Sequence, residues 1–221
     1  MAGRPELQNG FLGAQPKFAE FGLSTESHQE PEIHSSTNQL EVKIRTSKPS
    51  KVTANLTHCA KNEELPQHVF TQTKDNVVSF LVSLPDVGYY KLQIFALLLP
   101  DDSKTLPGVF NYLINCTNVT SAVSTYPKQF AQWKEGCYIV EPASLSGLAN
   151  LSNVRFEAYI PGAKSAAIVA DGNWSHLQKN SAALWEGRVD LDAYKGKDVK
   201  VTLNANYGED NKFASLLEYR L

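Results

Sequence analysis

The stretch Asp86-Val87-Gly88-Tyr89-Tyr90-Lys91-Leu92 decides the fold. It separates two apolar runs, 77–84 and 89–99, each typical of a strand. The spacing Asp-x-Gly-x-Tyr is that of the tyrosine corner of immunoglobulin-like sandwiches, where the hydroxyl bonds back to the backbone between strands E and F. An antibody-type domain would carry a cysteine two residues after Tyr90, and this chain carries Leu92. We therefore interpret Asp86, Gly88 and Tyr90 as the structural corner of a disulfide-free sandwich; the alternative is an ordinary turn between two strands.

The segment around this corner alternates with period two. Leu40, Val42 and Ile44 are separated by charged residues, which indicates a strand with one buried face. Further strands are expected at 52–56 and 109–116, giving six or seven short strands without an amphipathic helix. The sequence thus predicts an immunoglobulin-like sandwich over residues 31–118.

A second series of strands follows a polar connector. We place a linker at 119–129 and a second immunoglobulin-like sandwich at 130–221, with strands at 137–140, 154–160, 166–169, 185–191, 199–205 and 216–221. The pair Asp171-Gly172 is typical of a hairpin turn. This half has no tyrosine corner of its own.

Residues 1–30 are interpreted as an extended N-terminal arm. Its rings at Phe11, Phe18 and Phe21 could dock on the first domain, and the alternative is a disordered tail. The predicted fold class is therefore all-β, with two tandem immunoglobulin-like β-sandwich domains and an extended N-terminal arm.

Composition excludes several classes of function. The chain has 221 residues and a net charge of −2, so it offers no electrostatic case for binding nucleic acid or an anionic membrane. No apolar run approaches the roughly 20 residues of a membrane span. The three cysteines are sparse, which favours a reducing, cytoplasmic setting. Five Asn-x-Ser/Thr sites favour the alternative, a secreted protein; they begin at Asn55, Asn115, Asn118, Asn150 and Asn173.

The residues give no sign of an enzyme. Cys59 follows His58 directly, and neighbours on a strand point to opposite faces, so the two cannot pair. Cys116 and Cys137 stand in apolar runs that indicate packed thiols. The common catalytic motifs and metal-ligand spacings are missing. We expect no catalytic residue, no cofactor and no metal.

Aromatic residues of the second half are the candidates for binding. Trp174 follows the predicted hairpin turn, and an exposed tryptophan on a β-sandwich can stack against a sugar ring. Trp133 and Tyr138 lie just after the linker and could fix one domain against the other. We treat all three as candidates for a ligand contact or an interdomain contact; core packing is the alternative.

Several segments carry a family resemblance. They are Phe18-Ala-Glu-Phe-Gly-Leu-Ser24, Gly88-Tyr-Tyr-Lys-Leu-Gln-Ile-Phe-Ala96, Leu106-Pro-Gly-Val-Phe-Asn-Tyr-Leu-Ile-Asn-Cys116, Tyr126-Pro-Lys-Gln-Phe-Ala-Gln-Trp-Lys-Glu-Gly-Cys-Tyr138 and Val201-Thr-Leu-Asn-Ala-Asn-Tyr207. From about residue 14 to its end the chain resembles the C-terminal region of the kyphoscoliosis peptidase and hillarin family, a transglutaminase-like group linked to muscle and cytoskeleton.

The resemblance implies immunoglobulin-like modules without the Cys-His-Asp catalytic domain, which is not recognisable in this sequence. It carries over no catalytic residue and argues against a nucleophilic role for Cys116 and Cys137. By family analogy the partners would be filamin, other actin-associated proteins or septins.

Two functions of different classes follow. The first is a non-catalytic, cytoskeleton-associated protein-binding module that accepts a partner at a sheet edge or face. The second is a secreted glycoprotein that binds carbohydrate or another small ligand through the second domain, for which Trp174 should be exposed.

Overall fold

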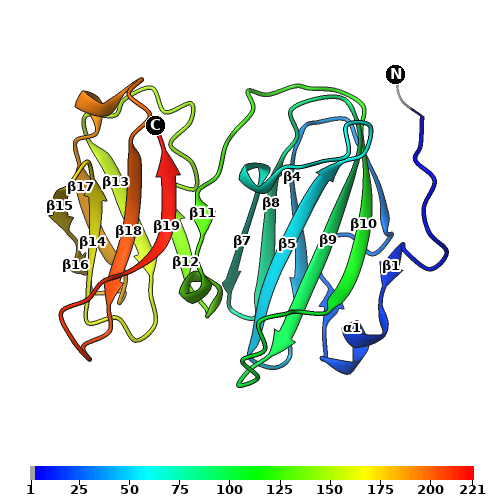
Figure 1. The fold of residues 1–221 in the computed structure, drawn as a ribbon, viewed down its shortest axis with the longest axis horizontal. Helices are drawn as coiled ribbons and strands as arrows, with labels where there is room; N and C mark the ends of the chain where they lie inside the picture. Colours follow the sequence, from blue (N-terminus) through cyan, green and yellow to red (C-terminus); the bar gives the residue numbers. More distant parts are fainter. Residues whose placement is uncertain (1–2) are drawn as a thin grey trace. The chain divides into compact units, whose positions relative to one another are not determined.

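The computed structural model describes residues 3–221, which divide into two compact units. The first unit ends at Val123 and the second runs from Ser124 to Leu221. Each unit is a sandwich of two β-sheets, and Figure 1 labels most of their strands. The prediction of an all-β chain with tandem immunoglobulin-like sandwiches is confirmed.

The first sheet of the first unit is built around the strand that follows the corner. Strand β9 (Gly88–Leu98) pairs with β5 (Ser50–His58) and with β10 (Gly108–Cys116), and β6 (Glu63–Glu64) adds to β5. The outer edge of β10 is covered twice, by the antiparallel β1 (Gly13–Ala14) and the parallel β3 (Glu32–Ser35). The N-terminal segment therefore closes this edge of the sheet.

The second sheet of the first unit supplies the facing layer. Its order is β2 (Ser24–Thr25), β4 (Gln39–Arg45), β8 (Val77–Ser83) and β7 (Val69–Lys74), and the short helix η1 (Pro66–His68) leads into β7. Val42 and Ile44 on β4 are fully buried, as the alternation predicts, because their side chains point between the two sheets.

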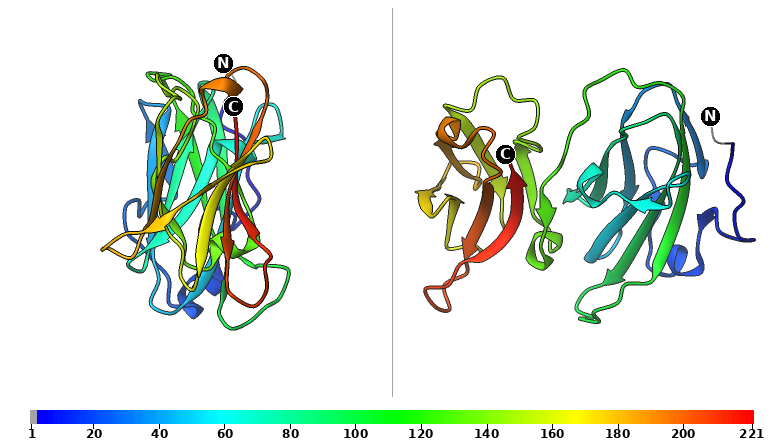
Figure 2. Two further views of the ribbon diagram at one scale, coloured as in Figure 1. Left: turned by 90° about the vertical axis from the view of Figure 1, so that its left-hand side faces the viewer. Right: turned by 45° about the horizontal axis from the view of Figure 1, so that its top comes forward.

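The N-terminal arm is packed onto this unit rather than free. Its helix α1 (Pro16–Glu20) lies beside β10 (Figures 1 and 2). Phe18 is buried, and its ring centroid lies 5.1 Å from that of Phe110. Phe21 packs against the same core, and the Asn111 side-chain amide donates to the carbonyl of Phe11.

The second unit repeats the two-layer plan. One sheet has the order β11 (Lys128–Gln129), β19 (Ala214–Arg220), β18 (Lys200–Asn206), β14 (Ser165–Ala170) and β15 (Asn173–His176). The other has the order β12 (Tyr138–Glu141), β13 (Val154–Tyr159), β17 (Trp185–Val189) and β16 (Gln178–Lys179). Two short helices complete the unit, η2 (Ala131–Lys134) and η3 (Asp192–Tyr194).

The hairpin that joins β14 to β15 positions the candidate site. Ala170 pairs with Asn173, so the loop consists of Asp171 and Gly172 alone. Both have positive φ, 50° and 77°, as a type I′ turn requires. The predicted hairpin turn is therefore present, and β15 becomes the edge of its sheet (Figure 1).

Within residues 3–221 the structure contains no helix with the length and apolar character of a membrane span.

Candidate interaction site

The tyrosine corner is a structural device of the first unit. The buried hydroxyl of Tyr90 donates to the carbonyl of Asp86 (2.8 Å) and accepts from the N–H of the same residue (3.0 Å). Burial raises the pKa of Tyr90 to about 12, so the hydroxyl keeps its proton for this bond. The carboxylate of Asp86 points elsewhere, to Lys61 at 3.1 Å. The corner therefore uses the backbone of Asp86, and its hydrogen bonds are made within the turn.

The three cysteines are free thiols in surroundings that disfavour the thiolate. Burial raises the pKa of all three, that of Cys137 to about 12. Cys116 donates to the carbonyl of Asn118 (3.4 Å) and Cys137 to that of Gln132 (3.6 Å). Because the thiolate is the nucleophilic form, these groups are poor nucleophiles at neutral pH. In the described part of the chain, no three His, Cys, Asp or Glu side chains are grouped to hold a metal ion.

The aromatic candidates separate by exposure. Trp133, in η2, is 1% exposed, whereas Trp174, on β15, is 50% exposed. Tyr138 is half-buried, and its ring stacks on that of Tyr159 with centroids 5.1 Å apart. Among these candidates Trp174 presents the accessible ring, so the candidate site is built around it.

Trp174 belongs to an exposed aromatic cluster, defined as Trp174, His176 and Phe213. Trp174 and His176 lie two positions apart on β15, so they share one face, with ring centroids 6.0 Å apart and nearly parallel. Phe213 meets Trp174 edge-on at 5.0 Å. It precedes β19, in a loop ordered by the side chain of Asn206, which donates to the carbonyls of residues 210 and 212.

The backbone of β15 leaves polar groups at the edge of the sheet. The N–H of Leu177 donates to the carbonyl of Ala166, which fixes the hydrogen-bonded pairs of the β14–β15 ladder. Bonded pairs alternate with non-bonded ones along an antiparallel ladder, so Trp174 and His176 fall at non-bonded positions. Their N–H and C=O groups point away from β14, toward the open edge.

A polar groove of roughly 540 Å³ adjoins this cluster at His176. It is lined by Arg155, His176, Gln178, Glu186, Gly187 and Arg188. The chain passes from β15 to β16 over Gly187, where a Cβ atom would lie 2.8 Å from the side chain of Leu177. The absence of a side chain at Gly187 lets the strand change sheets there.

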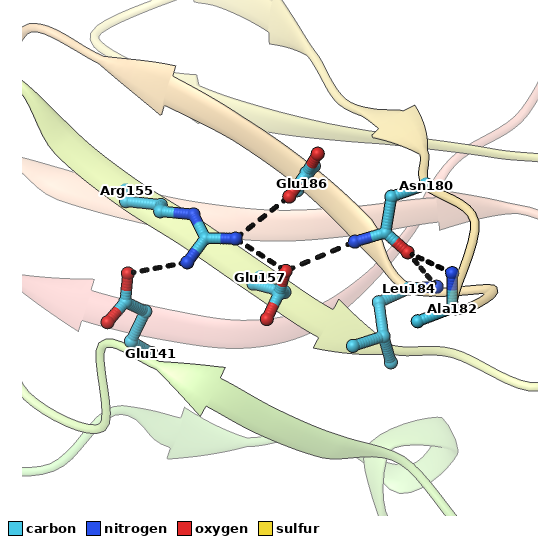
Figure 3. Close-up of polar contacts among 7 residues, drawn as sticks. All are labelled: Glu141, Arg155, Glu157, Asn180, Ala182, Leu184 and Glu186. Atoms are coloured by element: carbon cyan, nitrogen blue, oxygen red, sulfur yellow. Dashed lines mark hydrogen bonds and ion pairs between the residues drawn. The ribbon is translucent and has the colours of Figure 1, made fainter.

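The charge of Arg155 is compensated within the sheet. Its guanidinium contacts Glu157 (2.7 Å), Glu186 (2.9 Å) and Glu141 (3.4 Å), as Figure 3 shows. Glu157 is buried and also accepts from the amide of Asn180 (3.1 Å). Hydrogen bonding to Arg155 lowers the pKa of Glu186. Three carboxylates therefore share this one guanidinium, which leaves Arg155 few donors for a ligand.

Arg188 differs from its neighbour in this respect. It lies directly opposite Arg155 in the β13–β17 ladder, and it is exposed. Within residues 3–221, no carboxylate lies within ion-pair distance of its guanidinium. The groove thus holds one arginine that is bound by carboxylates and one that has no ion-pair partner among the described residues.

Sequence reasoning singled out Trp174 but not His176, Phe213 or Arg188. The alternation Trp174-x-His176 was a usable signal for two aromatic rings on one face. Arg188 joins the site through strand register and Phe213 through the loop before β19, and the sequence carried no comparable signal for either.

Comparisons with known proteins agree with the fold. The family model described as "KY-like, immunoglobulin-like domain" matches residues 6–127. Kyphoscoliosis peptidase of Mus musculus is 26% identical over 206 residues, which cover 91% of this chain and 30% of that protein. The Homo sapiens protein of the same name is 26% identical over 210 residues, with the same coverage. The chain therefore spans about 30% of the length of the curated relatives it matches.

Two solved structures resemble the chain weakly. A chimeric titin Z1Z2-Z1Z2 tandem has a TM-score of 0.26 at 13% identity, covering 90% of this chain and 95% of that one. The pullulanase SAP of Group B Streptococcus has a TM-score of 0.24 at 10% identity, covering 87% and 23%.

Proposed function

This chain belongs to the family of KY-like, immunoglobulin-like domains, and on that premise we propose that it is a non-catalytic protein-binding module acting as a cytoplasmic, cytoskeleton- or muscle-associated scaffold. The observation that carries the proposal is the exposed aromatic cluster at the open edge of β15. Half-exposed aromatic rings beside unpaired backbone groups are what a protein partner can bind by strand addition.

The chemistry of the thiols supports a binding role over a catalytic one. A cysteine nucleophile needs a lowered pKa, and burial raises the pKa of Cys59, Cys116 and Cys137. By family analogy the partner would be filamin, another actin-associated protein or a septin.

Titration of the purified chain with purified filamin, and separately with a septin filament preparation, tests this proposal. We expect saturable binding to at least one of them, measured by calorimetry. Absence of binding to every cytoskeletal protein tested would overturn the scaffold role. The variant Cys137→Ala serves as a control, because a non-catalytic module should bind as well without this thiol.

The exposure of Trp174 favours a second candidate, a ligand-binding domain for carbohydrate. This alternative requires that sugars quench or shift the tryptophan fluorescence of the chain and that Trp174→Ala removes the effect. A glycan array without signal would eliminate it.

The intact mass of the protein from its own source distinguishes the compartments of the two candidates. A cytoplasmic scaffold should have three free thiols that alkylate after denaturation and no added hexose mass. Hexose on any of the five glycosylation sites would favour the secreted ligand-binding protein.

A further inference from the structure

We propose that the edge of β15 is a docking site for an extended acidic peptide segment, a strand in which an apolar side chain is followed by a carboxylate. This inference rests on the proposed protein-binding function and names the surface and the chemistry of the partner. Three features of the second unit carry it: open backbone groups, the exposed aromatic cluster and the guanidinium of Arg188, which has no ion-pair partner among the described residues.

The open backbone groups of β15 determine how a partner strand would run. The N–H and C=O of Trp174 lie in the plane of the sheet and point away from β14, so a strand laid along β15 can exchange hydrogen bonds with them. β15 is four residues long and is paired on its β14 side. The other edge of this sheet is β11, which is only two residues long. β15 is therefore the longer edge, and it offers a partner strand the longer row of backbone groups.

The aromatic cluster specifies the apolar side chain. A strand added to β15 places alternate side chains on the face of Trp174 and His176, at cross-strand distances of about 4.5–5.5 Å between Cβ atoms. Trp174 is half exposed although Phe213 and His176 already contact its ring. An apolar or aromatic side chain from the partner would cover the remaining half.

The groove specifies the charge. His176 belongs to the cluster and also lines the groove that contains Arg188, so one extended segment can reach both. Arg155 is already bound by Glu157, Glu186 and Glu141, whereas the Arg188 guanidinium has no carboxylate partner among the described residues. A carboxylate of the partner would supply it, and guanidinium–carboxylate pairs are the stronger class of hydrogen bond.

The test uses the whole chain and a defined peptide library. Fluorescein-labelled octapeptides of Thr and Val carry one Phe and one Glu at varied spacings, and each has a matched Gln version. Fluorescence anisotropy measures affinity, and amide chemical shifts locate the binding. We expect the best Glu peptides to bind at least tenfold more tightly than their Gln versions and to shift the amide resonances of Trp174 and His176.

Matched variants separate the three features. Arg188→Gln should abolish the preference for Glu over Gln, whereas Lys104→Gln, the same charge change on an exposed loop of the first unit, should leave it unchanged. Trp174→Ala should weaken binding about tenfold or more, and Trp174→Phe should recover most of it. A peptide N-methylated at alternate amides should lose binding, because it cannot pair with the edge.

The outcomes distinguish this site from the proposed function. Equal binding of Glu and Gln peptides, equal binding of the N-methylated peptide, or shifts that leave Trp174 unmoved would overturn the docking site. Self-association of the chain through the same edge, or binding of glycans but no peptide, would overturn it too. If filamin binds Arg188→Gln and Trp174→Ala as well as the natural chain, the scaffold stands and this site is wrong.

Discussion

In the first unit, we expect the loss of the Tyr90 hydroxyl to have the clearest effect on stability. Tyr90→Phe keeps the buried ring and removes the hydroxyl that bonds both the carbonyl and the N–H of Asp86. Two backbone groups lose their partner, which should lower the free energy of unfolding by about 1–3 kcal/mol. Chemical denaturation of the whole chain measures the loss.

Asp86→Asn is the matched control for that change. Tyr90 bonds only the backbone of residue 86, whereas the carboxylate contacts Lys61 at the surface. An exposed ion pair of this kind contributes at most about 1 kcal/mol. If Asp86→Asn costs more than Tyr90→Phe, the side chain and not the backbone holds the corner, contrary to our interpretation.

Cys137 gives the chain a stability that depends on pH. Its pKa is about 12 in the folded protein and about 8.5 in an unfolded chain, so the folded state holds the proton more tightly. This contribution to the free energy of unfolding is fully present below about pH 8.5. It falls by about 1.4 kcal/mol per pH unit as the pH rises toward 12.

Cys137→Ala should therefore flatten the fall in unfolding free energy between pH 9 and 10, measured by urea denaturation at several pH values. Cys59→Ala, at a half-buried thiol, should flatten it less. Parallel curves for the natural chain and Cys137→Ala would contradict the burial that we assign to this thiol.

At the level of single residues, the sequence predicted what depends on local spacing. Asp86, Gly88 and Tyr90 lie within five residues, and the corner requires only those. Trp174 was a candidate because it follows a hairpin turn. Arg188 was not, because its role depends on facing Arg155 across a ladder and on which carboxylates Arg155 already binds. Such relations depend on the pairing register of the strands, which cannot be read from a single sequence.

Among the elements, the N-terminal arm depends most on tertiary contacts that the sequence pattern does not reveal. α1 is five residues long and would not be stable alone, so its stability must come from Phe18. Phe18→Ala should destabilise the first unit by about 3 kcal/mol, because a buried ring against Phe110 is replaced by a cavity.

Phe21→Ala should cost clearly less, since Phe21 is half-buried on the same arm. Both variants can be followed by thermal and urea denaturation. Equal and small effects would mean that the arm is not part of the folded unit. The match of the family model from residue 6 onward agrees with an arm that belongs to the domain.

Element prediction succeeded where alternation was strong and failed where pairing was needed. β4 and β5 follow from period-two patterns, and β9 follows from the apolar run 89–99. β3 was not predicted individually, because it is stabilised by parallel pairing with the distant β10. β7 is joined to β8 by Asp75-Asn76, with φ of 53° and 64°, a tight turn without the usual glycine.

For the whole molecule, the connector begins with residues that are hydrogen-bonded to a buried side chain of the first unit. The amide of Asn38 is fully buried; it accepts from the N–H groups of Thr120 and Ser121 and donates to the carbonyls of Ser121 and Leu84. We therefore expect fragments 1–123 and 124–221 to fold separately, each around its own core. Cooperative unfolding in circular dichroism measures this for each fragment.

Shortening the first fragment to 1–117 should lower its unfolding free energy by about 1–3 kcal/mol, because it removes three of the four bonds of a buried amide. The sharper test is a double-mutant cycle. Asn38→Ala should be costly in 1–123 and much less costly in 1–117, since the bonds it breaks are already absent. An equal cost in both fragments would mean that Asn38 stabilises the unit through Leu84 alone, and the connector would then not belong to the first domain.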